Sequence, residues 1–357
     1  MKGIAAFGGL YALLVISAVA RTPPIAPPPQ GKLYHGCYWG GVGTDDHDPT
    51  EHDVRPKDVA AYEQAVGAKT TWVYFSNNWF ESRAFPKETC QWIRGLGKIP
   101  YIRLMLRSDV DQDHSEKFFT LSRIIAGDFD SDLRAWAGAA KEFGTPVLVE
   151  WGTEPNGKWF SWNGKWNGGA GEGPKRYQAT YRHIVDIMRG EAADNLQWVW
   201  HVNWLDQPEE EWNAFENYFP GREYCDWLAL SAYGPTTPGT RDGTESFRFK
   251  LRNAYPRLTR VAPDKPIIVA EFGCDLRNPR LNAASWAKRA LEDLFSGRWP
   301  AIIGFCWWNE AWQNDENRKH DSDMIVLHDR ELTRVFRDEL TEHNDRIHSS
   351  AVAGTTK

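Results

Sequence analysis

The sequence alternates apolar, strand-like runs with amphipathic, helix-like segments along most of its length. The eight apolar runs are residues 35–40, 71–76, 99–106, 146–152, 197–202, 227–232, 266–271 and 301–307. Helix-like segments are residues 56–66, 87–95, 130–143, 174–189, 246–259, 282–296 and 330–344. Strands that alternate with helices form parallel sheets through right-handed crossovers. Eight such units predict a closed (β/α)8 TIM barrel, and no glycine-rich dinucleotide fingerprint follows the first strand.

The N-terminal residues have the pattern of an export signal. Residues 1–20 combine one positive charge, an apolar stretch and a small-x-small end, which is typical of a signal peptide. The apolar stretch is slightly short for a membrane span, and an uncleaved anchor is the alternative. Residues 21–31 form a Pro-rich linker, the barrel occupies 32–346, and 347–357 is a flexible tail. We therefore expect a secreted or periplasmic protein.

Composition excludes some classes of partner. The net charge of -6 and pI near 6.0 argue against nucleic acid and against an anionic membrane surface. The chain has 19 Trp and 12 Tyr, and flat aromatic faces suit sugar rings, although most of these residues must serve packing. Five cysteines without CxxC spacing disfavour a zinc site, and the odd count leaves at least one thiol unpaired within the chain.

Two glutamates stand at the ends of separate strand-like runs. Glu154 follows the run 146–152, and Glu271 ends the run 266–271. Side chains alternate faces along a strand, so Glu150 points to the same side as Glu154. In a barrel both Glu154 and Glu271 lie at the end that carries active sites, and a glycosidase needs two such carboxylates. The alternative for either residue alone is a helix cap or an ion pair with arginine.

Polar and aromatic residues gather at the other strand ends. Asn203 ends the fifth strand and Tyr233 follows the sixth. The loop 156–169 interleaves Trp159, Trp162 and other aromatics with Gly and Asn rather than placing them at helical spacing. Exposed aromatics cost solubility unless something binds them. We interpret this cluster as sugar platforms, with loop anchoring as the alternative.

Acidic, histidine-containing loops follow the first and eighth strands, at residues 45–53 and 315–323. The two loops would be neighbours in a closed barrel. Neither has a recognised ligand spacing, so the sequence favours solvated loops over a metal site. No metal and no other cofactor is expected.

Several ordered motifs resemble one family of enzymes. The runs 124–130 and 144–147, the segment Glu154-Pro-Asn-Gly-Lys-Trp159, and the runs 177–189 and 270–273 are similar to those of glycoside hydrolase family 26, the β-mannanase family of the retaining clan A barrels. The resemblance implies that Glu154 is the acid/base and Glu271 the nucleophile. It also implies that Tyr233 hydrogen-bonds the nucleophile. Residues expected to bind the sugar are Trp159, Trp162, Asn203, Tyr233 and Trp307.

The chain departs from the family pattern at two positions. The family usually has His directly before the acid/base, where this chain has Thr153, and Arg four residues before it, where this chain has Glu150. Arg103 on the third strand lies beside Glu150 if both point inward. A lone buried charge is costly, so we predict an Arg103–Glu150 ion pair.

The sequence thus predicts a retaining β-glycoside hydrolase, most simply an endo-acting enzyme on β-1,4-mannan. Its partner is a polysaccharide or oligosaccharide. Lichenan and β-1,3-xylan are alternative substrates within the family. A carbohydrate-binding protein without catalysis is the alternative outside it, although such a protein has no need of both glutamates.

Overall fold

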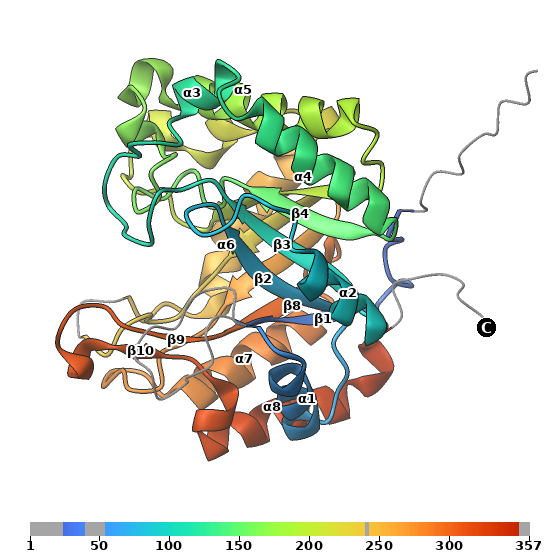
Figure 1. Ribbon diagram of the computed structural model, residues 1–357. Coiled ribbons are helices and arrows are strands. Elements are labelled where there is room, and N and C mark those ends of the chain that lie inside the picture. The colour runs from blue at the N-terminus through green and yellow to red at the C-terminus, as the bar shows by residue number, and fades with distance from the viewer. Residues whose placement is uncertain (1–23, 40–53, 240–242, 350–357) are drawn as a thin grey trace, which may run out of the picture.

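The computed structural model describes residues 24–39, 54–239 and 243–349, so the predicted signal peptide and the loop 45–53 lie outside the described residues. Eight parallel strands close into a barrel in sequence order, with β8 pairing β1 (Figure 1). The strands are β1 (Tyr34–Trp39), β2 (Trp72–Asn78), β3 (Ile99–Met105), β4 (Val147–Trp151), β5 (Leu196–Asn203), β6 (Trp227–Ser231), β7 (Ile267–Phe272) and β8 (Ile302–Asn309). The (β/α)8 prediction is confirmed.

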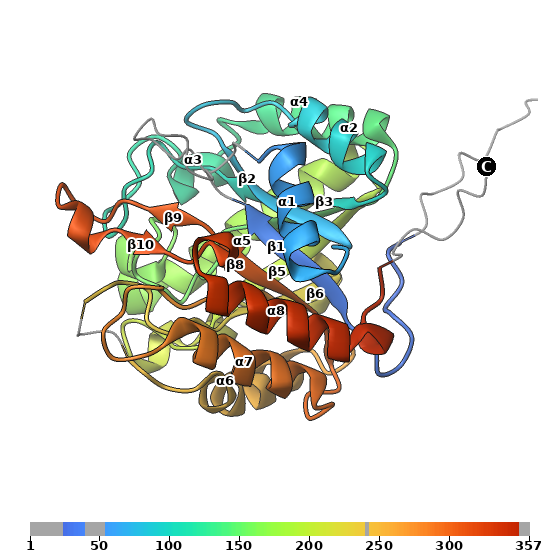
Figure 2. The same ribbon diagram turned by 90° about the horizontal axis from the view of Figure 1, so that it is seen from below.

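The helices surround this barrel on its outside (Figures 1 and 2). They are α1 (Pro56–Val66), α2 (Lys87–Gly95), α3 (Leu121–Ile125), α4 (Asp130–Phe143), α5 (Gly169–Gly190), α6 (Phe247–Val261), α7 (Ala283–Phe295) and α8 (Arg330–Glu342). Local chemistry explains several ends. α1 begins at a proline, and side chains of Ser246, Asn282 and Asp329 cap α6, α7 and α8. None of the helices in the described ranges is long and apolar enough to cross a lipid bilayer.

Helix α5 begins at Gly169, five residues before the predicted start at Pro174. Its first turns closely approach the aromatic loop. A Cβ placed on Gly173 would lie 2.3 Å from the Cα of Gly164 in that loop. Glycine at both positions therefore allows the loop after Glu154 to pack directly on the helix.

The sequence patterns do not predict three further elements, α3, β9 and β10, because these are too short to show periodicity. Helix α3 has five residues, and β9 (Ala311–Trp312) pairs with β10 (Ser322–Asp323) in a small antiparallel ribbon beyond β8. The ribbon extends from the same end of the barrel as the loops that follow the strands (Figure 1). It thus adds to the wall around the barrel mouth.

The ordered chain extends slightly past the predicted end of the barrel. Ile347 forms a parallel bridge with Leu33, and the backbone N–H of His348 donates to Leu33 O at 2.8 Å. Residues 347 and 348 are therefore part of the fold rather than of a flexible tail.

Candidate active site

Glu154 lies directly after β4 at the mouth of the barrel. It is almost fully buried, and its backbone has a φ of 49°, in the left-handed region that non-glycine residues rarely adopt. Its backbone N–H donates to His201 O at 2.9 Å, and its carbonyl accepts from Gly157 N at 2.8 Å. The indole of Trp159 donates to Glu154 Oε2 at 2.6 Å. Backbone and side chain of Glu154 are thus both held in place, at the cost of local strain.

Glu271, at the end of β7, is 3% exposed. Tyr233 OH donates to its Oε2 at 2.9 Å, which is the contact that the sequence predicted. Arg103 Nε lies 3.8 Å from Oε1. Burial raises the pKa of Glu271 to about 7, Arg103 opposes that rise, and the nearby charge of Glu154 adds to it. The two glutamates therefore influence each other electrostatically.

Glu150 lies deeper, on the inward face of β4, and is fully buried. Tyr74 OH donates to its Oε1 at 2.5 Å, and Tyr101 OH donates to its Oε2 at 2.6 Å. His201 Nδ1 lies 3.2 Å and 3.1 Å from the two oxygens. Burial alone would raise the pKa of Glu150, but the charge of His201 and these hydrogen bonds hold it below its ordinary value.

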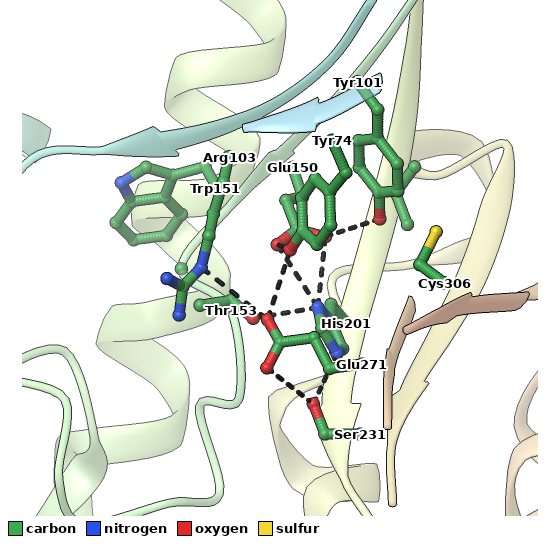
Figure 3. A network of polar contacts seen from close by, with 12 residues as sticks. Tyr74, Tyr101, Arg103, Glu150, Trp151, Thr153, His201, Ser231, Glu271 and Cys306 are labelled. Atoms are coloured by element: carbon green, nitrogen blue, oxygen red, sulfur yellow. Dashed lines mark hydrogen bonds and ion pairs between the residues drawn. The ribbon is translucent and has the colours of Figure 1, made fainter. Parts of the chain in front are cut away.

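The predicted ion pair between Arg103 and Glu150 is replaced by a different pairing. The two residues are partners in the β3–β4 register, as expected. The ion pair described for Arg103 nevertheless joins it to Glu271, while Glu150 pairs with His201 at 3.1 Å (Figure 3). The Arg103 guanidinium also lies over the rings of Phe160 and Trp308, 5.3 Å and 5.2 Å from their centroids. Register fixes neighbouring backbones, but a long side chain reaches past its neighbour.

The predicted tryptophan platforms need two corrections. Trp307 is 0% exposed and faces the helix layer, where its Nε1 donates to Met324 O and its ring packs on Phe336. Trp162 is 2% exposed, stacks on Phe160 and donates to Thr153 O at 2.7 Å. Both rings anchor structure and leave no face for a sugar.

The next residue on β8, Trp308, takes the place predicted for Trp307. It is 6% exposed, stacks on Tyr38 with ring centroids 3.5 Å apart, and meets Tyr233 edge-on. Strand alternation puts adjacent residues on opposite faces, so a shift of one residue changes a buried anchor into a mouth-lining ring.

The remaining predicted residues lie near the same mouth. Trp159 is partly buried and bonded to Glu154, as described above. Asn203 is partly buried, and its backbone N–H donates to Asn156 Oδ1 at 2.9 Å. The amide of Asn156 returns a bond to Asn203 O at 2.9 Å. This reciprocal pair ties the end of β5 to the loop after Glu154.

Sequence reasoning missed five residues of the site: Tyr74, Tyr101, His201, Ser231 and Trp308. All of them lie on barrel strands, and period-2 alternation with Arg103 and Glu150 could have placed Tyr101 inward. Their meeting around two carboxylates depends on contacts across the barrel, which local patterns do not report.

Glu150, His201 and Glu271 offer atoms that a metal could use. One ligand atom each of Glu150, His201 and Glu271 lies within 4.8 Å of the others. Hydrogen bonds within the protein already explain why these side chains lie together, because Glu150 accepts from two hydroxyls and from the imidazole. On the loop after β8, Asp315 pairs with His320 at 2.7 Å in an exposed position.

Part of the chain matches one family of enzymes in comparisons with known proteins. Residues 107–274 match the sequence model of glycosyl hydrolase family 26. Endoglucanase H of Acetivibrio thermocellus is 28% identical over 190 residues, which are 53% of this chain and 20% of that protein. A mannan endo-1,4-beta-mannosidase of Bacillus subtilis is 24% identical over 236 residues, which are 62% of this chain and 59% of that protein. The chain thus spans less than two thirds of either relative.

Solved structures share the fold. A GH26 β-mannanase from Bacteroides ovatus superposes with a TM-score of 0.60 at 16% identity, covering 91% of this chain and 92% of that one. The match is in architecture, with the barrel preserved over almost the whole length of both chains. This likeness shows the fold, and the match to glycosyl hydrolase family 26 covers residues 107–274, which include β4 to β7 and both Glu154 and Glu271.

Proposed function

We propose that this protein is a retaining β-glycoside hydrolase that cleaves internal glycosidic bonds of a polysaccharide. The observation that carries the proposal is the placement of Glu154 directly after β4 and of Glu271 on β7, at one barrel mouth where the charge of Glu154 raises the pKa of Glu271. Two carboxylates that interact in this way, beside aromatic rings, suit acid catalysis and nucleophilic attack on a sugar.

In the proposed mechanism Glu271 attacks the anomeric carbon while Glu154 gives its proton to the leaving oxygen. The C–O bond to the leaving sugar breaks, and a covalent glycosyl–enzyme forms on Glu271. Glu154 then takes a proton from water, and the resulting hydroxide displaces Glu271 from the sugar. Tyr233 and Arg103 lie beside the attacking carboxylate and support its ionised form. The Trp159 indole fixes Glu154 Oε2.

The preferred substrate is β-1,4-mannan. Support comes from the family and from the name of the Bacillus subtilis relative, a mannan endo-1,4-beta-mannosidase. A β-glucan is the second candidate, because the relative with 28% identity is named an endoglucanase. We further propose that the chain is exported to the periplasm or medium, which rests on the pattern of residues 1–20 alone.

The test is hydrolysis of mannan, glucomannan, lichenan and xylans by the purified protein, followed by proton NMR. We expect oligosaccharides of mixed length from mannan and a first product with the β configuration. A first product with the α configuration would refute retention. Binding of mannan without hydrolysis of any of the polysaccharides would leave only the carbohydrate-binding alternative.

A further inference from the structure

His201 connects the two buried carboxylates through hydrogen bonds. The residue comes from β5 and is completely buried. Its Nδ1 faces both oxygens of Glu150, at 3.2 Å and 3.1 Å, and lies 2.9 Å from Thr153 Oγ1. Its Nε2 lies 2.7 Å from Ser231 Oγ, and that hydroxyl lies 3.4 Å from Glu271 Oε2. Figure 3 shows the four groups in a chain from Glu150 to Glu271.

The number of donors and acceptors in this series of hydrogen bonds determines where its hydrogens can lie. A carboxylate only accepts, so the hydrogen between Glu150 and His201 belongs to Nδ1. Nε2 then has two possibilities. In a neutral ring Nε2 accepts, and Ser231 must give it the only hydroxyl hydrogen. In an imidazolium Nε2 donates to Ser231 Oγ, and the Ser231 hydrogen is available for Glu271 Oε2.

The charges around the ring favour the imidazolium. Burial alone would lower the pKa of His201, but the charge and hydrogen bonds of Glu150, followed by the charges of Glu271 and Glu154, raise it above its ordinary value. The titratable and charged groups around this network are Glu150 and Glu154 on or after β4, Glu271 on β7, Tyr74 on β2, Tyr101 and Arg103 on β3, Tyr233 after β6 and Cys306 on β8.

We infer that His201 is a positioning residue which, as an imidazolium, turns the Ser231 hydroxyl toward Glu271 and so supplies the nucleophile with a donor. The inference rests on the proposed role of Glu271. It also gives meaning to the departure at Thr153, because an imidazole from the neighbouring strand contacts the Thr153 hydroxyl. The His201 ring thus lies beside Thr153, but it contacts the buried carboxylates instead of facing the sugar.

The first test is nitrogen NMR of the full chain labelled in its histidine rings, with His201 assigned through the spectrum of His201→Gln or, if that variant does not fold, through the altered ring signals of Ser231→Ala. We expect both ring nitrogens of His201 to carry a hydrogen at pH 6.5, the ordinary pKa of a histidine ring, because the pKa of His201 is raised above it. A ring without the Nε2 hydrogen at pH 6.5 would overturn the inference. This measurement needs no substrate, so it stands even if the protein hydrolyses no glycan.

The second test follows Glu271 itself by carbon NMR of its side-chain carboxyl, assigned with Glu271→Gln. Ser231→Ala removes the donor, so we expect the pKa of Glu271 to rise and kcat/KM at pH 6 to fall about fivefold. Ser76→Ala is the matched control. Ser76 is also a buried barrel serine, but it bonds Tyr38 OH at 3.0 Å.

Ser76→Ala should leave the Glu271 titration where it is. The inference fails if Ser231→Ala leaves that titration unchanged, or if Ser76→Ala moves it equally. Absence of hydrolysis by the wild type would instead refute the proposed function, while both NMR titrations would still report on the hydrogen-bonded chain.

Discussion

Glu150 and Glu271 are two buried glutamates of one barrel interior, and their environments drive them in opposite directions. Glu150 has a lowered pKa, whereas the pKa of Glu271 is raised to about 7. Burial opposes ionisation at both, so burial does not explain the difference. What differs is the neighbouring charge and the supply of hydrogens: the charge of His201 and three hydrogen bonds lower the pKa of Glu150, whereas the charge of Glu154 adds to the rise at Glu271.

Tyr74 shows how that supply is divided. Its hydroxyl lies 2.5 Å from Glu150 Oε1 and 3.2 Å from Glu271 Oε1, yet it has a single hydrogen. The shorter contact directs that hydrogen to Glu150, which also receives those of Tyr101 and His201. Glu271 is left with Tyr233, the more distant Ser231 and the Arg103 charge. The deeper carboxylate is thus an anchored anion, and the upper one is held ready to exchange a proton or form a bond.

The largest expected effect is the loss of activity when Glu271 is replaced. Glu271→Ala should lower kcat/KM at least about 10⁴-fold, because the group that forms the covalent intermediate is lost. Added azide should restore turnover and give a glycosyl azide with the α configuration. Glu154→Ala with azide should instead give the β product. The same azide anomer from both variants would contradict the assigned roles.

Replacement of Glu150 should affect stability more than replacement of Glu271. Glu150→Gln leaves the buried His201 without its anion, and loss of one partner of a buried pair typically costs about 3–5 kcal/mol in the free energy of unfolding. Urea denaturation at pH 7 measures it. An unchanged midpoint would mean that Glu150 is not the anion described above.

Glu271→Gln should stabilise the protein at alkaline pH. A folded-state pKa of about 7 against an ordinary 4.5 means that folded Glu271 keeps a proton which the unfolded chain has lost. Stability of the wild type therefore falls as pH rises from about 4.5 to 7. The variant lacks this loss, so it should match the wild type at pH 4 and exceed it at pH 8 by at most about 3 kcal/mol. A variant less stable at pH 8 would reverse the comparison.

Tyr74→Phe should produce the smallest change in stability and activity. It tests whether the Tyr74 hydroxyl donates to Glu150 or to Glu271. The variant removes one bond to Glu150, which typically costs about 1–2 kcal/mol of unfolding free energy. Because its hydrogen serves Glu150, the acid limb of kcat/KM, set by Glu271, should move little. A large shift of that limb with unchanged stability would show that Tyr74 donates to Glu271 instead.

The sequence was sufficient for the barrel and for the two glutamates at its mouth. Eight apolar runs with helical segments between them leave few alternative folds, and the contact between Tyr233 and Glu271 was implied by the family resemblance. The direction of the Glu271 pKa does not follow from the sequence. It depends on burial and on the charges that closure of the barrel brings around one carboxyl group.

The errors share one physical origin. Trp307 and Trp308 differ by a single step of strand alternation, and β7–β8 has register shifts that no local pattern reveals. Arg103 pairs across the barrel with Glu271 instead of with its strand neighbour. Closure of the barrel brings residues from four or five strands together, and sequence periodicity describes each strand separately.

The left-handed backbone at Glu154 has a consequence for how this lineage can change. A glutamate at φ of 49° is held against its own conformational preference, whereas glycine or asparagine adopts this region with little strain. Replacement of Glu154 by either would relieve the backbone while removing the acid. If the proposed function holds, a single substitution would thus remove hydrolysis and relieve the backbone, so we expect catalytically silent descendants of such a barrel to arise easily and to persist.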